Sequence, residues 1–226
     1  MSEEDVTSRR QGYGLDRTLA ISDGVFAFAV TLLVLDLFVP TLSPEASSTD
    51  LWQALSKESE SFLNYILSFL IAGVWWNAHH RVFERMRSSN STLRWLNLFF
   101  LLWIALLPFF TKILDQYSTL QLGVVLYAAD QAAAGLSLTL MWLYASRKQG
   151  LIDKNLDKRA IRFTTVRIVI APIVFLISIG FSIVGPNFAV YSWYMILPAV
   201  AIAYRLTRNN ENERPKSKNK KENALK

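Results

Sequence analysis

The sequence predicts an all-α integral membrane protein with six transmembrane helices and both termini in the cytoplasm. Three observations lead to this fold class. Of the 226 residues, 52% are hydrophobic. They gather in six runs, each near the roughly 20 residues that cross a bilayer. Nearly all Lys and Arg residues lie between or after these runs, so the net charge of +6 reflects membrane topology and we expect no nucleic-acid partner.

Turn signals and charged segments separate the expected spans. The first span ends at Pro40, and a polar, acidic stretch at 41–60 leads to the second. The basic stretch 79–87 follows the second span, and the charged loop 147–162 follows the fourth. A Gly-Pro-Asn sequence at 185–187 is a strong turn signal before the last span. The six spans lie at about residues 19–39, 62–78, 93–113, 120–144, 166–184 and 188–204.

The distribution of basic residues predicts the orientation. Of the 24 Lys and Arg residues, 22 lie in the N-terminal segment, the second-to-third and fourth-to-fifth connections, and the tail. The connections on the other side contain only Lys57 and Lys112. Because positive residues stay in the cytoplasm, we expect a multi-pass protein of the cell membrane with cytoplasmic termini. Residues 1–204 are expected to form one domain, and 205–226 a basic, disordered cytoplasmic tail.

Several classes of function are excluded or disfavoured by the residue types present. The chain has no cysteine, which excludes disulfides, thiolate metal sites and cysteine nucleophiles. His79 and His80 are adjacent, so on a helix they point about 100° apart and form a poor metal site. We find no recognisable nucleophile, and we expect no enzyme activity, no cofactor and no fixed metal. No internal repeat supports an inverted-repeat transporter.

The first span opens with an unusual set of polar residues. Arg17, Ser22 and Asp23 place a cation, a hydroxyl and a carboxylate within two helical turns. One interpretation is a polar helix start, with Asp favoured by the helix dipole. The other is a polar cluster that holds the helix base, because Arg17 and Asp23 are six residues apart and too distant for an i,i+4 pair. We expect a His–Asp hydrogen bond between helices. The candidate partners on the second and third spans are Trp75, Trp76, Asn77, His79, His80 and Asn97.

Further along the first span, apolar residues form a stripe. Phe28, Leu32 and Leu35 follow the spacing i, i+4, i+7, and Thr31 lies beside them. A stripe with this spacing is usually a helix-packing surface. If several copies of the helix met on one axis, the stripe would instead form apolar rings around a narrow pore, and such constrictions gate by dewetting.

The fourth span contains a carboxylate near its middle. Asp130 would cost about 2.5–3.5 kcal/mol at a helix centre exposed to lipid, so it should face protein or water. It is either a proton- or cation-binding group or part of an interhelical hydrogen bond with a residue such as Thr139 or Asn97. The first interpretation makes a coupled transporter the alternative function.

Three segments resemble a known family of channels. Arg17, followed after three residues by Ile21, Ser22 and Asp23, resembles the first-helix signature of the family named after transmembrane protein 175, whose members are potassium-permeable channels. The segments 76–81 and 97–109 are similar to the second and third helices of that family. The resemblance covers residues 17 to 113, and the last three spans agree only in number and length.

The resemblance implies a homotetramer whose first helices line a central pore without a carbonyl filter. The narrowest position of the family lies five residues after the motif Asp, which is Phe28 here. The further pore-facing positions are Thr31, Leu32 and Leu35. The family also ties its motif to polar residues of the second and third helices, which implies a network at the helix base formed by Arg17, Ser22, Asp23, Trp76, His79, His80 and Asn97.

Two positions depart from the family pattern. Ile21 replaces the motif Phe, and Phe28 is bulkier than the usual Ile or Leu. We therefore expect a passive, potassium-preferring cation channel with an apolar constriction. Its partners are potassium and other monovalent cations, membrane lipid and three further copies of the chain. The alternative is a proton- or cation-coupled secondary transporter that uses Asp130.

Overall fold

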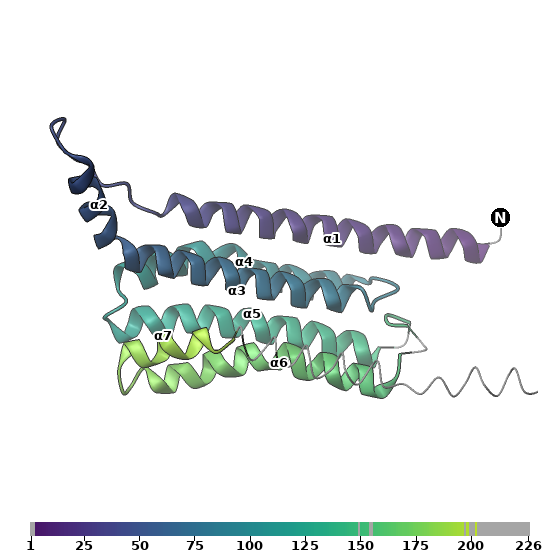
Figure 1. Ribbon diagram of the computed structural model, residues 1–226. Helices are drawn as coiled ribbons and strands as arrows, with labels where there is room; N and C mark the ends of the chain where they lie inside the picture. Colours follow the sequence, from purple (N-terminus) through teal and green to yellow (C-terminus); the bar gives the residue numbers. More distant parts are fainter. Residues whose placement is uncertain (1–2, 149, 154–155, 197, 199–201, 203–226) are drawn as a thin grey trace, which may run out of the picture.

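The structure is a computed structural model that describes residues 3–148, 150–153, 156–196, 198 and 202, with side chains from Gly14 onward. The described residues form seven helices, most of them long and nearly parallel (Figure 1). In chain order these are α1 (Glu3–Leu35), α2 (Ser48–Lys57), α3 (Ser59–Phe83), α4 (Ser91–Gln116), α5 (Gln121–Arg147), α6 (Lys158–Phe181) and α7 (Pro186–Tyr194).

Five of these helices are long and apolar enough to cross a membrane: α1 over Gly14–Leu35, and α3, α4, α5 and α6 over their full lengths. They overlap the first five expected spans, although α1 ends at Leu35 and α6 at Phe181, before the expected ends at 39 and 184. Most extend further than the expected spans, into flanking segments that contain Arg, Lys or Glu. Because these residue types are good helix formers, the helix continues where the apolar run has ended. The sixth expected span is described only in part, because α7 covers its beginning and most of 197–204 lies outside the described residues.

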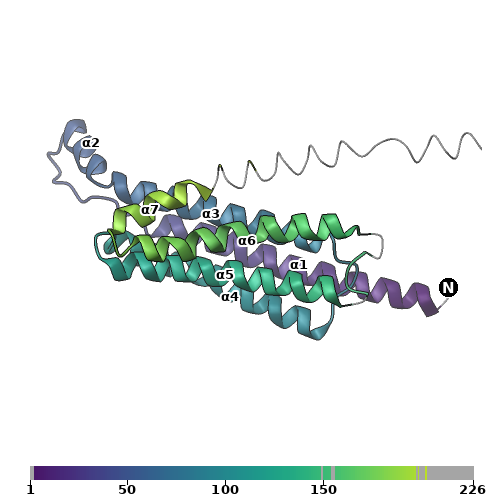
Figure 2. The same ribbon diagram turned by 90° about the horizontal axis from the view of Figure 1, so that it is seen from below.

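The helices form a layered bundle with α5 at its centre. In Figure 1, α1 lies along one side of the bundle against α3 and α4, and α6 and α7 lie on the far side of α5. Figure 2 shows α5 between α4 and α6. Gly135 of α5 permits this close packing, since a Cβ there would lie 2.6 Å from Trp75 of α3 and 2.7 Å from Pro172 of α6.

The segment at 41–60, expected to be a polar connection, contains the short helix α2. Its start is a capping box, in which the Ser47 hydroxyl accepts from the Asp50 backbone N–H and the Asp50 carboxylate accepts from the Ser47 backbone N–H. Hydrogen bonds from the Ser47 side chain and backbone hold the pKa of the exposed Asp50 carboxyl below its ordinary value. No residue of α2 is buried, and the helix projects from the end of the bundle opposite the start of α1 (Figure 1).

At the other end of the bundle, the α3–α4 and α5–α6 connections are joined to each other. The Arg87 backbone N–H donates to the Leu151 carbonyl at 2.8 Å, and the Arg87 guanidinium forms an ion pair with Asp153. The Ser88 hydroxyl donates to the carbonyl of Gly150 at 2.7 Å. Gly150 has a φ of 87°, which favours glycine at this turn. These contacts fix α5 and α6 to the helices that carry the candidate site.

Candidate functional site

Helix α1 packs against the bundle along one face only. Its buried residues recur every three or four positions, as one face of a helix requires. They are Leu15, Thr18, Ser22, Phe26, Ala29 and Leu33. They lie against α3 and α4, so the opposite face of this membrane-spanning helix packs against no other helix in the described part of the chain.

The residues expected from sequence to line a pore lie mostly on the free face of α1. Phe28 is 66% exposed and Leu35 is 75% exposed, and Thr31 is also exposed. The Thr31 hydroxyl donates to the Phe28 carbonyl at 2.9 Å, so its hydrogen is already used by the helix backbone. Leu32 differs because it is half-buried at the edge of the packed face. In the described part of the chain, Phe28 and Leu35 therefore stay exposed and are not buried against another helix.

A buried chain of hydrogen bonds joins the base of α1 to two other helices. The Asn97 side chain of α4 donates to the Ser22 hydroxyl oxygen at 3.0 Å. The Asn97 amide oxygen lies 2.8 Å from Nε2 of His79 on α3. Because an amide oxygen only accepts, His79 carries its proton on Nε2 in this contact. All three side chains are 1% exposed or less, so each polar group inside this junction depends on its neighbours.

Aromatic rings enclose the imidazole of this chain. His79 stacks on Phe83 with ring centroids 4.4 Å apart and on Phe100 at 5.4 Å. Phe26 of α1 lies 6.1 Å from the same imidazole. The rings keep water away from the hydrogen bonds and strengthen them, because the surroundings have a low dielectric constant.

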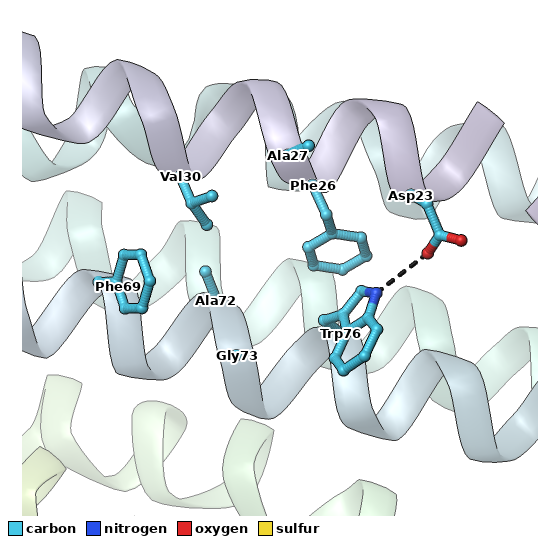
Figure 3. Close-up of a pocket in the computed structure, with 8 residues that line it drawn as sticks. All are labelled: Asp23, Phe26, Ala27, Val30, Phe69, Ala72, Gly73 and Trp76. Carbon is cyan, nitrogen blue, oxygen red and sulfur yellow. Dashed lines mark hydrogen bonds between the residues drawn. The ribbon is translucent and has the colours of Figure 1, made fainter. Parts of the chain in front are cut away.

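Asp23 makes a separate contact at the surface of the same junction. The indole N–H of Trp76 donates to its carboxylate at 3.0 Å (Figure 3). Trp76 also stacks on His80 at 5.6 Å. The expected His–Asp hydrogen bond is wrong. Ser22 and Asp23 point about 100° apart on the helix, so Ser22 enters the buried chain while Asp23 lies at the α1–α3 edge.

Hydrogen bonds join five of the seven residues that were expected in the polar network, in two separate groups. Arg17 is exposed, and no hydrogen bond or ion pair joins it to a residue in the described part of the chain. His80 lies 3.5 Å from Glu84, one turn further along α3, and both are well exposed. A contact of this kind contributes little to stability.

A shallow groove of about 250 Å³ runs between α1 and α3, beginning at Asp23 (Figure 3). Apart from the carboxylate and the indole N–H, its walls are apolar. The lining residues are Asp23, Phe26, Ala27, Val30, Phe69, Ala72, Gly73 and Trp76. No group of three or more His, Cys, Asp or Glu side chains with metal-binding geometry occurs among the residues that were described.

Asp130 lies elsewhere, inside the bundle on α5. Its carboxylate accepts from the Gln131 amide at 2.8 Å, and the Gln131 oxygen accepts from the Trp75 indole at 2.8 Å. The expected partners Thr139 and Asn97 are wrong. Thr139 donates to the Gly135 carbonyl instead, and Asn97 belongs to the chain at the base of α1.

Sequence reasoning missed a second buried polar group near the middle of the bundle. The Thr111 hydroxyl of α4 donates to Ser68 of α3 at 3.0 Å, and Ser68 is 3.1 Å from the Tyr127 hydroxyl of α5. The available signal was the spacing on α3, where Ser68, Trp75 and His79 recur at i, i+7 and i+11 and so share one helix face.

Together, these features define a multi-pass helical membrane protein whose first helix is anchored on one side and free on the other. The family model described as endosomal/lysosomal potassium channel TMEM175 matches residues 17–108, which include Phe28, Thr31, Leu32 and Leu35 and the hydrogen-bonded chain of Ser22, Asn97 and His79. The chain is 32% identical over 173 residues to a potassium channel of Streptomyces collinus, covering 75% of this chain and 82% of that protein. It is 31% identical over 180 residues to a potassium channel of a Chryseobacterium species, covering 80% and 88%.

A solved structure has the same fold. The crystal structure of a lysosomal potassium-selective channel TMEM175 homolog from Chamaesiphon minutus superposes with a TM-score of 0.73 and 24% identity, over 84% of this chain and 97% of that chain. This chain therefore belongs to the TMEM175 family, a family of ion channels and not of enzymes. The resemblance inferred from the first-helix motif is confirmed.

Proposed function

We propose that this chain is one subunit of a passive, potassium-preferring channel, a homotetramer in which four α1 helices surround a central pore. The observation that carries the proposal is the free face of α1: a membrane-spanning helix whose exposed residues include Phe28 and Leu35. The two bacterial relatives named potassium channels support the choice of ion.

In this arrangement the narrowest point of the pore is a ring of four Phe28 side chains. Thr31 and Leu35 follow at about one and two turns along the same face, and Leu32 contributes only its exposed edge. Apolar rings of this kind close a pore by excluding water. Conduction then requires the ring to be wide enough, or wet enough, for a cation with part of its hydration shell.

The polar chain at the base of α1 has a positioning role in this proposal. It fixes α1 on α3 and α4 through Ser22, Asn97 and His79, so the Phe28 side chains are held at a constant distance from the axis. An apolar constriction such as the Phe28 ring depends on such support, because phenyl side chains form no hydrogen bonds that would hold them in place.

We also propose that the protein lies in the cell membrane, with both termini in the cytoplasm. The basic residues lie mainly on one side of the spans. Helix α7 begins with Pro186 after a turn and packs back onto the bundle, with Trp193 fully buried 4.9 Å from Tyr127. It is the first part of a sixth span in this proposal.

The coupled-transporter alternative is not favoured. Its coupling group, Asp130, is 1% exposed and hydrogen-bonds to Gln131 inside the bundle, away from the free face of α1. The relatives named above are channels.

The experiment that tests the proposal is single-channel recording of the reconstituted protein in planar bilayers with KCl on one side and NaCl on the other. We expect discrete current steps and a reversal potential that favours potassium. A flux that saturates and follows an imposed proton gradient would contradict a passive channel. The mass of the protein in detergent is a second readout, since the pore requires four chains of 25.7 kDa each.

A further inference from the structure

A buried carboxyl group on α5 has no role in the function proposed above. Asp130 lies in the middle of the α5 span and is 1% exposed. Helices α3, α4, α6 and α7 all pack against α5. The carboxyl group is therefore enclosed within the subunit itself. It lies away from the free face of α1 and from the α1–α3 groove.

The two oxygen atoms of this carboxyl group have different surroundings. Oδ2 accepts one hydrogen bond, from the Gln131 amide at 2.8 Å. Oδ1 is inaccessible to solvent and has no hydrogen-bond partner. The orientation of the Gln131 amide is fixed from the other side, because its oxygen accepts from the Trp75 indole N–H. Only the amide NH₂ can face Asp130.

Among the residues that the structure describes, no positively charged side chain forms an ion pair with Asp130. The three ion pairs in the described part of the chain involve other residues, and no ionisable side chain of α3, α4, α6 or α7 forms a hydrogen bond with either of its oxygens. The titratable neighbour on its own helix is Tyr127, one turn away, whose hydroxyl contacts Ser68. On α3, His79 is bonded to Asn97.

An ionised carboxylate can accept several hydrogen bonds, but Asp130 receives only one from the described residues. Burying a charge with so few partners is strongly unfavourable. A protonated carboxyl group avoids that cost. Its carbonyl oxygen still accepts from Gln131, and the bare oxygen becomes the hydroxyl. The hydroxyl hydrogen has no acceptor among the described residues, but an unpaired neutral donor costs far less than an unpaired buried charge.

We propose that Asp130 is a proton-binding site that holds one proton on Oδ1, so that each subunit contains an uncharged carboxylic acid in its interior. The ligand is a proton and not a metal cation, because no group of three or more His, Cys, Asp or Glu side chains that could hold a metal ion occurs in the described part of the chain. The neutral acid links α5 through Gln131 to Trp75 of α3 without a charge in the membrane. This inference does not depend on the proposed channel function.

Infrared spectroscopy of the full-length protein at neutral pH tests the proposal, because exposed carboxyl groups are ionised there. We expect the C=O stretch of a carboxylic acid in the wild type. The band should remain in Asp50→Asn, a matched control that removes an exposed carboxylate, and should be lost in Asp130→Asn. A wild-type spectrum without the band, or a band that survives in Asp130→Asn, would overturn the assignment.

A second variant keeps the test decisive if Asp130→Asn does not fold. Gln131→Leu removes the donor to Oδ2, so the same C=O band is expected to shift to higher frequency. A band that stays at its wild-type frequency in Gln131→Leu would place the proton on another carboxyl group and overturn the proposal.

Discussion

At Phe28, the free face of α1 presents a phenyl ring where a smaller aliphatic side chain is usual in the family. Under the proposed pore, Phe28→Ala replaces four rings on the axis with methyl groups. We expect potassium flux into liposomes to rise several-fold, because a wider and less apolar constriction is easier to wet. Potassium preference over sodium should fall in the same preparation, measured by biionic reversal potential.

The matched control for this substitution is Phe181→Ala at the end of α6. Phe181 is also half-exposed, at 47%, but it belongs to a helix on the far side of α5 from α1 (Figure 1). It should leave flux unchanged. Equal flux in wild type and Phe28→Ala would remove Phe28 from the pore.

At the base of α1, Asn97 serves two buried partners at once. Asn97→Leu removes the donor to the Ser22 hydroxyl oxygen, although Ser22 still donates to the Thr18 carbonyl, and it leaves the Nε2 hydrogen of His79 without its acceptor. A buried donor orphaned in this way costs about 1–3 kcal/mol. We therefore expect a lower unfolding temperature, which is measured by size-exclusion chromatography of heated samples. Asn77→Leu is the control, because the Asn77 side chain is exposed and donates to the Gly73 carbonyl of its own helix. Similar losses in both variants would contradict the role assigned to Asn97.

Asp23 is expected to matter less for stability than Asn97, although both were expected in one network. Its contact with Trp76 lies at an exposed edge. The sequence could predict that Ser22 and Asp23 need partners on other helices, and it limited the candidates to a few residues at the same depth. It could not predict the pairing, because that depends on the rotation of α3 and α4 about their own axes.

Helix α5 illustrates what a single element contributes to the bundle. Gly135→Ala places a Cβ within 2.6–2.8 Å of Trp75 and Pro172, so α3 or α6 must move away. Overpacking of this kind costs about 1–3 kcal/mol, and we expect reduced thermal stability. Gly180→Ala on α6 is the control, since nothing lies within 4 Å of its added Cβ. A Gly135→Ala protein as stable as the control would show that this contact is not tight.

The existence of the first five spans could be predicted from hydropathy, whereas their ends and their neighbours could not. Helix α1 begins before the apolar run because its charged residues are also helix formers. Helix α2 was missed although Ser47 and Asp50 form a recognisable capping box. The central place of α5 was also unpredictable, because in a membrane the lipid-facing and the buried residues of a helix are both apolar.

The basic residues of the whole molecule are distributed asymmetrically, which predicts its topology in the membrane. The number of spans decides on which side of the membrane the tail lies. Five candidate spans lie in the described residues, and an odd number would put the two ends on opposite sides. The sixth span proposed from 188–204 returns the tail to the side of the N-terminus.

The absence of cysteine allows this topology to be tested with one introduced thiol at a time. Glu45→Cys in the α1–α2 connection should react with a membrane-impermeant maleimide on intact cells. Arg159→Cys at the start of α6 and Asn210→Cys in the tail should react only after permeabilisation, because both lie in basic segments that we place in the cytoplasm. Labelling of both Glu45→Cys and Asn210→Cys on intact cells, with Arg159→Cys protected, would mean five spans. Labelling of Arg159→Cys but not Glu45→Cys on intact cells would reverse the orientation.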